Sequence, residues 1–162
     1  METFVALLRA VNVGGTGKLA MADLRSRCEQ LGLREVRTYI QSGNVIFASE
    51  HRPDHLKSIL EEALQVPVYL RTALEMQQIA RDNPFPGASP SQLLIHFLDE
   101  PDHSHIEIAG GDQGEQWKVS GGQVYVHFPN GMGRSKLKLP FGTGRNLNTI
   151  TRLADMALGQ KS

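Results

Sequence analysis

The segment from residue 3 to residue 12 most constrains what this chain can fold into. It reads TFVALLRAVN, and both of its alternating sets of side chains are largely apolar. A strand with one face in water would alternate apolar and polar residues, so this pattern predicts a central strand that is covered on both faces. We therefore expect a sheet with further elements packed against each side.

The rest of the first half predicts an α+β fold of βαββαβ order. The expected elements are a strand at 3–12, a helix at 21–31, strands at 36–41 and 45–49, a helix at 53–64 and a strand at 66–71. Gly32 and Pro53 are natural helix boundaries, and Ser42-Gly43-Asn44 suits a hairpin turn. This order is that of the split βαβ, or ferredoxin-like, unit. A third helix begins with a capping box, Thr72 to Glu75, and must end before Pro84.

The second half predicts a smaller α+β subdomain. Three prolines between residues 83 and 91 favour a linker there, which separates a ferredoxin-like subdomain at 1–82 from a C-terminal subdomain at 92–162. The expected elements are clear strands at 93–98 and 124–128, weaker strands at 106–109 and 116–119, and a final amphipathic helix at 150–158 with Asn148 as its N-cap. We expect residues 93–128 to cover the second face of the first strand.

Composition narrows the function classes. The chain has 17 Lys and Arg and 17 Asp and Glu, so it has no global basic field of the kind that binds nucleic acid without sequence preference. Its single cysteine, Cys28, excludes an intramolecular disulfide and fits a reducing compartment. The apolar run from Phe4 to Leu8 is too short for a signal peptide or a membrane span. We expect a soluble, cytoplasmic protein with no membrane partner.

Charge is divided unevenly within this balance. Residues 118–152 contain six Lys or Arg and no Asp or Glu, whereas residues 99–115 contain six acids and no Lys or Arg. The basic stretch also holds two Gly-rich segments, 129–136 and 142–149. Backbone N–H groups beside fixed cations can replace the hydration of an anion, so the sequence predicts an anion-binding site.

Familiar catalytic and cofactor motifs do not fit. A P-loop fails because Asn12 stands at its first Gly and Leu19 at its Ser/Thr. The loose dinucleotide pattern Gly15-x-Gly17-x-x-Ala20 lacks a following βαβ unit and an acid for the ribose. Asp99, Asp102, His103 and His105 fit a solvated loop better than a metal site. No Ser, His and Asp set indicates nucleophilic catalysis. We expect no metal and no cofactor, and the sequence assigns no reaction.

Three features each leave two interpretations open. Arg9 either forms an ion pair with Asp23 or Glu35 or points into a pocket. The Ser42-Gly43-Asn44 segment is either a ligand contact or only a turn. The first turn of the last helix lacks an acid, so it accepts either a ligand anion or a carboxylate from residues 99–115. Cys28, by contrast, lies on an apolar helix stripe and is expected to be buried and unreactive.

Five segments together resemble a widespread, mostly bacterial family that is catalogued as a domain of unknown function. They are LLRAVNVGG at 7–15, MADLR at 21–25, TYIQSGNVIF at 38–47, PNGMGRSKL at 129–137 and RNLNT at 145–149. The resemblance implies a soluble α+β protein with two subdomains, of which the first is ferredoxin-like. It implies no established activity, substrate or catalytic residue.

Our leading hypothesis is a pocket between the two subdomains for a small molecule that carries a phosphate or a carboxylate. The candidate ligand-binding residues are Arg9, Asn12, Gly14, Gly15, Lys18, Gln41, Ser42, Asn44, Arg134, Ser135, Lys136, Arg145, Asn146, Asn148 and Thr149. One alternative is a nucleic-acid-binding module that uses the basic 118–152 surface. Another is an interaction domain without a ligand, in which these polar residues only fix the subdomain interface.

Overall fold

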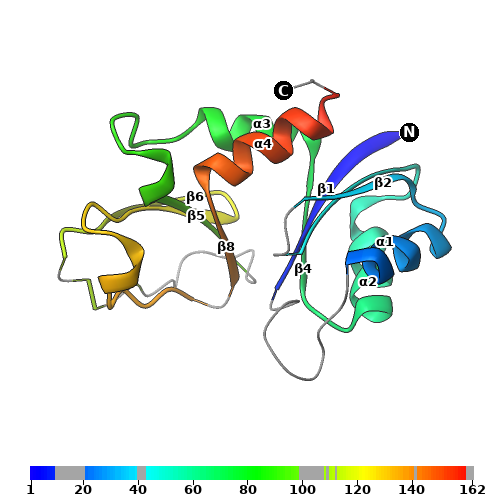
Figure 1. The fold of residues 1–162 in the computed structure, drawn as a ribbon, viewed down its shortest axis with the longest axis horizontal. Helices are drawn as coiled ribbons and strands as arrows, with labels where there is room; N and C mark the ends of the chain where they lie inside the picture. Colours follow the sequence, from blue (N-terminus) through cyan, green and yellow to red (C-terminus); the bar gives the residue numbers. More distant parts are fainter. Residues whose placement is uncertain are drawn as a thin grey trace. The chain divides into compact units, whose positions relative to one another are not determined.

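The chain forms two compact units, residues 1–78 with 152–162 and residues 79–151 (Figure 1). The computed structural model describes residues 1–9, 21–39, 43–98, 108, 110–111, 113–140 and 142–159, without the side chains of Met21, Ala22 and Arg134. The segment expected as a linker, 83–91, lies within the second unit. No helix in the described residues is long and apolar enough to cross a membrane.

The first unit is built on a four-stranded antiparallel sheet. Its elements are β1 (Glu2–Leu8), α1 (Met21–Gln30), β2 (Arg34–Tyr39), β3 (Asn44–Ser49), α2 (Pro53–Leu64) and β4 (Val68–Thr72). The strand order is β2-β3-β1-β4, so β1 lies between β3 and β4. This confirms the predicted βαββαβ order and the central place of the first strand. Residues 10–12, expected to continue that strand, lie outside the described residues.

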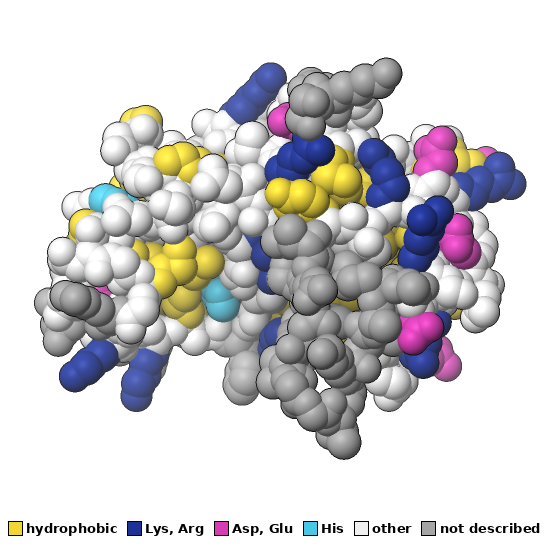
Figure 2. All heavy atoms as spheres, in the orientation of Figure 1, with side chains coloured by type: hydrophobic (Ala, Val, Ile, Leu, Met, Phe, Trp, Pro, Cys, Tyr) yellow, Lys and Arg dark blue, Asp and Glu magenta, His cyan; other side chains and the backbone are white. Residues whose placement is uncertain are grey.

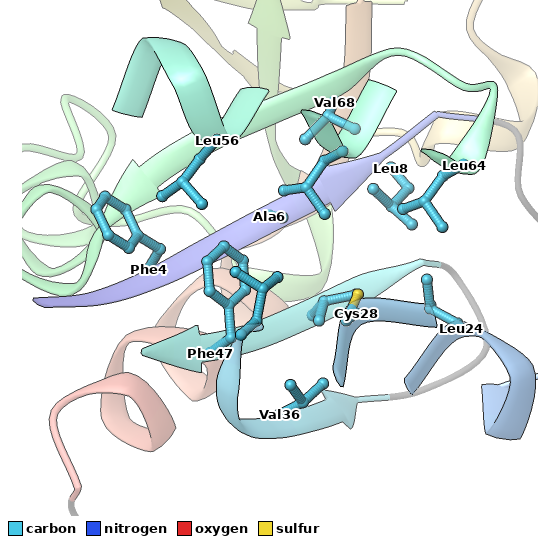
Figure 3. Packing of buried hydrophobic residues seen from close by; sticks show 13 residues of the cluster. Phe4, Ala6, Leu8, Leu24, Cys28, Val36, Phe47, Leu56, Leu64 and Val68 are labelled. Atoms are coloured by element: carbon cyan, nitrogen blue, oxygen red, sulfur yellow. The ribbon is translucent and has the colours of Figure 1, made fainter. Parts of the chain in front are cut away.

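One face of this sheet packs against α1 and α2. Phe4, Ala6 and Leu8 alternate along β1 and point into a core that also contains Leu24 and Cys28 of α1. Figure 3 shows these side chains converging with those of α2 between the helices and the sheet. Cys28 has no exposed surface, so its predicted place in the core is confirmed.

The opposite face of β1 is buried as well. Val5 and Leu7 have no exposed surface, and neither has Ile46, which lies opposite Val5 on β3. A strand that is covered on both sides is what its uninterrupted apolar sequence predicts. The expectation that residues 93–128 supply this second cover stays a prediction.

The helix boundaries follow the local sequence signals. At the end of α1, Gly32 adopts φ +86°, and the N–H groups of Gly32 and Leu33 bond to the carbonyls of Glu29 and Cys28, which is a Schellman motif. Pro53 stands in the first turn of α2. At the start of α3 (Ala73–Arg81), the Thr72 and Glu75 side chains each accept the other residue's backbone N–H, at 3.1 and 2.8 Å. The predicted capping box is thus confirmed.

The second unit contains another four-stranded antiparallel sheet, in the order β6-β7-β5-β8. Its strands are β5 (Leu93–Leu98), β6 (Gln116–Ser120), β7 (Gln123–His127) and β8 (Gly142–Asn146), with 3-10 turns η1 (Pro90–Gln92) and η2 (Met132–Arg134). Helix α4 (Leu147–Ala157) follows β8 directly. The strands expected at 93–98, 116–119 and 124–128 are present within a residue or two. The weak strand expected at 106–109 falls largely outside the described residues.

Strand β8 corrects the sequence interpretation, which treated residues 142–149 as a Gly-rich polar loop. Residues 142–146 instead pair with β5 in regular register, Gly142 opposite Leu98 and Arg145 opposite Ile95. A Cβ atom built on Gly142 would lie 1.9 Å from the carbonyl oxygen of Phe97, and one on Gly144 would lie 2.8 Å from a methyl carbon of Leu94. Gly142 therefore permits the close approach of the two backbones, and Gly144 leaves room for the Leu94 side chain.

The 129–140 segment covers one face of this second sheet. Met132, Leu137 and Leu139 pack against a cluster that includes Val124 and Val126 of β7. The apolar residues of the 129–140 segment thus belong to a core, and the polar residues between them remain to be considered as site residues.

Candidate functional site

Some of the predicted site residues lie outside the described part of the chain, and the rest fall into three groups. Asn12, Gly14, Gly15, Lys18, Gln41 and Ser42 lie outside the described residues, as does the side chain of Arg134. The others belong to the end of β1 and β3, to the 135–136 segment, or to β8 and the start of α4. A single cleft that unites these groups stays a prediction.

Arg9 directly follows β1 and is half-buried. Its guanidinium donates a hydrogen bond of 3.4 Å to the hydroxyl of Tyr69, and its backbone N–H bonds to the carbonyl of Pro67 at 3.1 Å. Among the described contacts there is no ion pair between Arg9 and Asp23 or Glu35, the two carboxylates that the sequence offered. Arg9 is therefore held at this sheet end by β4, through a tyrosine that sequence reasoning did not single out.

Asn44 shares this sheet face but has a turn role of its own. It is fully buried at the start of β3, opposite Leu7, and its side-chain amide donates to the carbonyl of Tyr39 at 3.0 Å. The neighbouring Gly43 has φ +80°, which glycine adopts without strain, and its carbonyl accepts the N–H of Leu8 at 2.9 Å. These contacts favour the turn interpretation for Gly43 and Asn44.

Among the candidate cations whose side chains the structure describes, Arg145 is the most buried, with 8% of its surface exposed. On β8 its Nη1 donates to the Thr143 hydroxyl at 2.7 Å and to the Gly144 carbonyl at 2.9 Å, both of them neutral oxygens. Burial lowers the pKa of Arg145 to about 10 from 12.5, because a desolvated guanidinium is less stable in its charged form. Thr143, two residues away on the same strand face, was missed because the sequence pattern did not reveal β8.

The start of α4 is capped by Asn146, and the expectation that Asn148 is the N-cap is wrong. The Asn146 Oδ1 accepts the N–H of Thr149 at 2.9 Å, whereas Asn148 is exposed in the first turn. The helix begins at Leu147 because β8 runs into it without a loop. Its first turn contains no acidic residue, as the sequence indicated.

Ser135 and Lys136 lie on the covering segment of the second sheet. The Ser135 hydroxyl donates to Glu115 at 2.5 Å, and this hydrogen bond is the main cause that lowers the pKa of the Glu115 carboxyl. Asn130 likewise donates to the Gln113 carbonyl at 2.7 Å. The described end of the acidic segment thus contacts the 130–135 loop, while Lys136 is exposed.

The described residues contain no group of three or more His, Cys, Asp or Glu arranged to hold a metal ion. The acidic loop considered for a metal, Asp99 to His105, lies outside them. What the structure provides is two arginines, Arg9 and Arg145, each half-buried or buried and each hydrogen-bonded to a neutral hydroxyl on a neighbouring or the same strand. Such groups can bind an anion.

Comparison with solved structures supports the fold. The chain resembles the conserved bacterial protein SP0830 from Streptococcus pneumoniae, with a TM-score of 0.75 and 24% sequence identity. The match covers 96% of this chain and 98% of that one. At this identity the likeness concerns the fold alone. No curated protein is detectably similar to the chain.

A family model matches residues 1–125 and bears the description "Protein of unknown function (DUF1697)". The matched range includes the LLRAVNVGG and TYIQSGNVIF segments, while PNGMGRSKL and RNLNT lie beyond it. The match extends over more than half of the chain and contains the whole sheet around β1. The chain therefore belongs to the family of proteins of unknown function DUF1697.

Proposed function

We propose that this protein binds a small molecule that carries a phosphate or a carboxylate group, with Arg145 as a principal anion contact. The observation that carries the proposal is the burial of Arg145. Desolvation lowers its pKa to about 10, and two hydrogen bonds from Nη1 go to the oxygens of Thr143 and Gly144. An anion beside this guanidinium would restore the stabilisation that burial removes.

The surroundings of Arg145 fit this role. Asn146 and Thr149 follow on the same strand–helix junction, and the first turn of α4 has no acid that would repel an anion. Unpaired N–H groups and the positive dipole at a helix start favour negative charge. Asn148, exposed in that first turn, is the side chain we assign to the ligand here, because Asn146 is engaged in capping.

Arg9 gives the proposal a second, independent part. It ends β1 within the family's LLRAVNVGG segment, half-buried beside the hydroxyl of Tyr69. A half-buried guanidinium next to a phenol can present charge-assisted hydrogen bonds to a phosphate or a carboxylate. The Gly14, Gly15 and Lys18 positions that follow complete this part of the proposal.

Nucleic-acid binding is less well supported. Ferredoxin-like sheets, a class to which we assign the βαββαβ unit, bind RNA by stacking bases on aromatic side chains of the central strands. On β1 and β3 the face away from the helices presents Val5, Leu7 and Ile46, and all three are fully buried. Figure 2 shows Lys and Arg interspersed with Asp and Glu over α1 and α2, so this face of the first unit does not extend the basic 118–152 surface with further continuous positive charge.

Thermal melting tests the proposal. The wild-type protein is melted with increasing sodium phosphate, a nucleoside monophosphate or citrate, while NaCl keeps the ionic strength constant. A ligand that binds only the folded state raises the melting temperature saturably, equivalent to about 2.7 kcal/mol at a hundred times its Kd. No saturable shift with any of these anions would contradict the proposal and favour an interaction domain without a ligand.

Variants locate the anion. Arg145→Met keeps the side-chain length without the charge and should remove most of the shift; Arg9→Met should reduce it by at least half. Lys138→Met changes an exposed cation of the same second unit and serves as the matched control. Far-UV circular dichroism checks that each variant is folded. A shift that Lys138→Met weakens as much as Arg145→Met does would indicate non-specific screening of positive charge.

A further inference from the structure

A groove of about 480 Å³ lies at β2, the edge strand of the first sheet. It is lined by Arg25, Glu29, Glu35, Val36, Arg37 and Gly159. All of these residues belong to the first unit, and none belongs to the anion site proposed above. The volume is within the range of about 300–1,000 Å³ that small-molecule sites occupy. We propose that this groove binds a small zwitterion of the free α-amino-acid type.

A β-bulge gives the groove its arrangement of side chains. On β2, Arg34 lies opposite Ala48 and Arg37 opposite Ile46, so two residues of β2 oppose one residue of β3 between these pairs. Without the bulge, Arg34 and Arg37 would point to opposite sheet faces; with it, they share one face. Val36 turns into the helix-side core, and Glu35 takes the left-handed conformation, φ +52°, which a non-glycine residue seldom adopts.

Strain of this kind is more frequent at ligand sites than elsewhere. Here both Glu35 and Arg37, which flank the buried Val36 in the sequence, line the groove. Within the described residues, the Glu35 carboxylate forms no ion pair and no hydrogen bond. It is thus available to a cation from solution.

Arg37 is held in place by α4. Its Nη2 donates a 2.8 Å hydrogen bond to the carbonyl of Met156, in the last turn of a helix that has no basic residue there. A cation at this position is stabilised by the negative end of the helix dipole. This bond uses one of the five guanidinium N–H donors, so Arg37 keeps donors for a carboxylate in a fixed position.

Helix α1 contributes the same pair of charges to the lining of the groove. Arg25 and Glu29 lie one turn apart on α1. The Nε atom of Arg25 is 3.8 Å from the Oε2 atom of Glu29, and the two side chains are 61% and 53% exposed. An exposed pair at this distance is weakly held, so both groups can turn to a ligand. Strand β2 and helix α1 therefore each offer one carboxylate and one guanidinium.

This pattern selects the class of ligand. The two arginines attract a simple anion, but the two glutamates repel it. A simple cation is attracted by the glutamates and repelled by the arginines. A molecule with an ammonium and a carboxylate on neighbouring atoms satisfies both kinds of group at once, which a zwitterionic amino acid does. The groove thus differs in chemistry from the Arg145 site, which contains no carboxylate among the side chains assigned to it.

An NMR titration of the full chain tests the proposal. ¹⁵N-labelled protein is titrated with L-alanine and, separately, with sodium acetate and methylammonium chloride at matched ionic strength. We expect L-alanine to shift the amide signals of residues 25–29 and 34–37 saturably. The two half-molecules should bind at least about tenfold more weakly, the equivalent of losing one charged contact.

Paired variants decide the outcome. Glu35→Gln removes the charge and leaves the backbone unchanged, and it should raise the Kd for L-alanine about tenfold. Glu62→Gln removes an exposed charge from α2, outside the groove, and should leave the Kd unaltered. Shifts that do not saturate, that acetate reproduces at the same concentration, or that Glu35→Gln leaves unchanged would overturn the proposal.

Discussion

The two sheets of this protein have the same number of strands and the same antiparallel pairing, yet different forces define strand β1 of the first sheet and strand β8 of the second. In the first sheet, β1 occupies the centre and is apolar on both faces, so hydrophobic burial alone specifies it. In the second sheet, β8 is an edge strand with the sequence GTGRN and almost no apolar surface. Its pairing with β5 depends on backbone hydrogen bonds and on the absence of side chains at Gly142 and Gly144.

This difference shows that glycine in a basic segment has two distinct uses. In an anion-binding loop it exposes backbone N–H groups; in β8 it lets one backbone approach another closely. The sequence suggests the first use for 142–149, and the geometry establishes the second for Gly142. The cations and amides beside them, Arg145 and Asn148, remain the part of the segment on which the anion proposal depends.

The largest expected effect is that of Gly142→Ala. The new Cβ would lie 1.9 Å from the Phe97 carbonyl oxygen, a backbone atom that cannot rotate away, so β8 must separate from β5. We expect a loss of more than about 3 kcal/mol in the free energy of unfolding, measured by urea denaturation. Gly133→Ala is the control, since nothing lies within 4 Å of its built Cβ, and it should change stability little. Equal stability of the two variants would contradict the close packing of β8.

The elements that sequence patterns predicted are those that local chemistry determines. β1, β3 and α2 have apolar periodicity, α3 has its capping box, and α1 ends at a glycine with positive φ. β8 could not be found in this way, because its partner β5 lies some 45 residues earlier in the chain and contributes the pairing surface. The bulge at Glu35 and the hydrogen bond from Arg37 to Met156 are also products of tertiary packing.

The candidate site was predictable to a smaller extent. Charge and glycine content singled out Arg9 and Arg145, and both are partly or largely buried in the structure. Tyr69, to which Arg9 donates a hydrogen bond, lies on another strand, and a contact between strands is not encoded in either segment alone. Thr143, two residues from Arg145, becomes a neighbour only once residues 142–146 are known to form a strand. The N-cap was assigned two residues too late, because a helix that follows a strand without a loop leaves no turn signal before it.

Cys28 tests whether the core of the first sheet excludes solvent as its apolar pattern requires. Burial, with a smaller contribution from Glu29, raises the pKa of this thiol to about 11 from 9.0. Below pH 9 both states keep the proton; above it the unfolded state ionises first, so stability falls as pH rises from about 9 to about 11. The loss attributable to Cys28 is about 3 kcal/mol over this window.

Comparison with Cys28→Ala isolates this contribution, since the variant should lose that part of the alkaline decline while other groups titrate as before. The native thiol should also react with an aromatic disulfide reagent only as fast as the protein opens. Rapid labelling at pH 8 in the absence of urea would show that the core admits solvent. The core around β1 would then not be more tightly closed to water than the polar edge strand β8 of the second sheet.

Thr72→Ala should have a moderate effect. Thr72 ends β4 and accepts the Glu75 N–H at 3.1 Å, so its loss leaves one helix-start donor without its cap. We expect a decrease of about 1 kcal/mol in the free energy of unfolding. Thr72→Ser retains the hydroxyl and should recover most of it. If Ser and Ala variants are equally unstable, β-branching in the strand, rather than capping, is the contribution of Thr72.

The smallest effect on stability is expected from Arg145→Met without ligand, although this variant matters most for function. At neutral pH, lowering the pKa of a permanently charged group from 12.5 to about 10 corresponds to about 3 kcal/mol of unfavourable desolvation. An apolar side chain of similar length removes that cost, but it leaves the Thr143 hydroxyl and the Gly144 carbonyl without their donor, at about 1–3 kcal/mol each. At about 1.5 kcal/mol each, the two lost hydrogen bonds offset the relieved desolvation, so the free energy of unfolding should change by no more than about 1 kcal/mol. Arg145→Ala also leaves a cavity and should be less stable than Arg145→Met.

A loss of several kcal/mol in Arg145→Met itself would mean that the guanidinium is needed to hold β8 against β5. Arg145 would then be a structural residue rather than an anion contact.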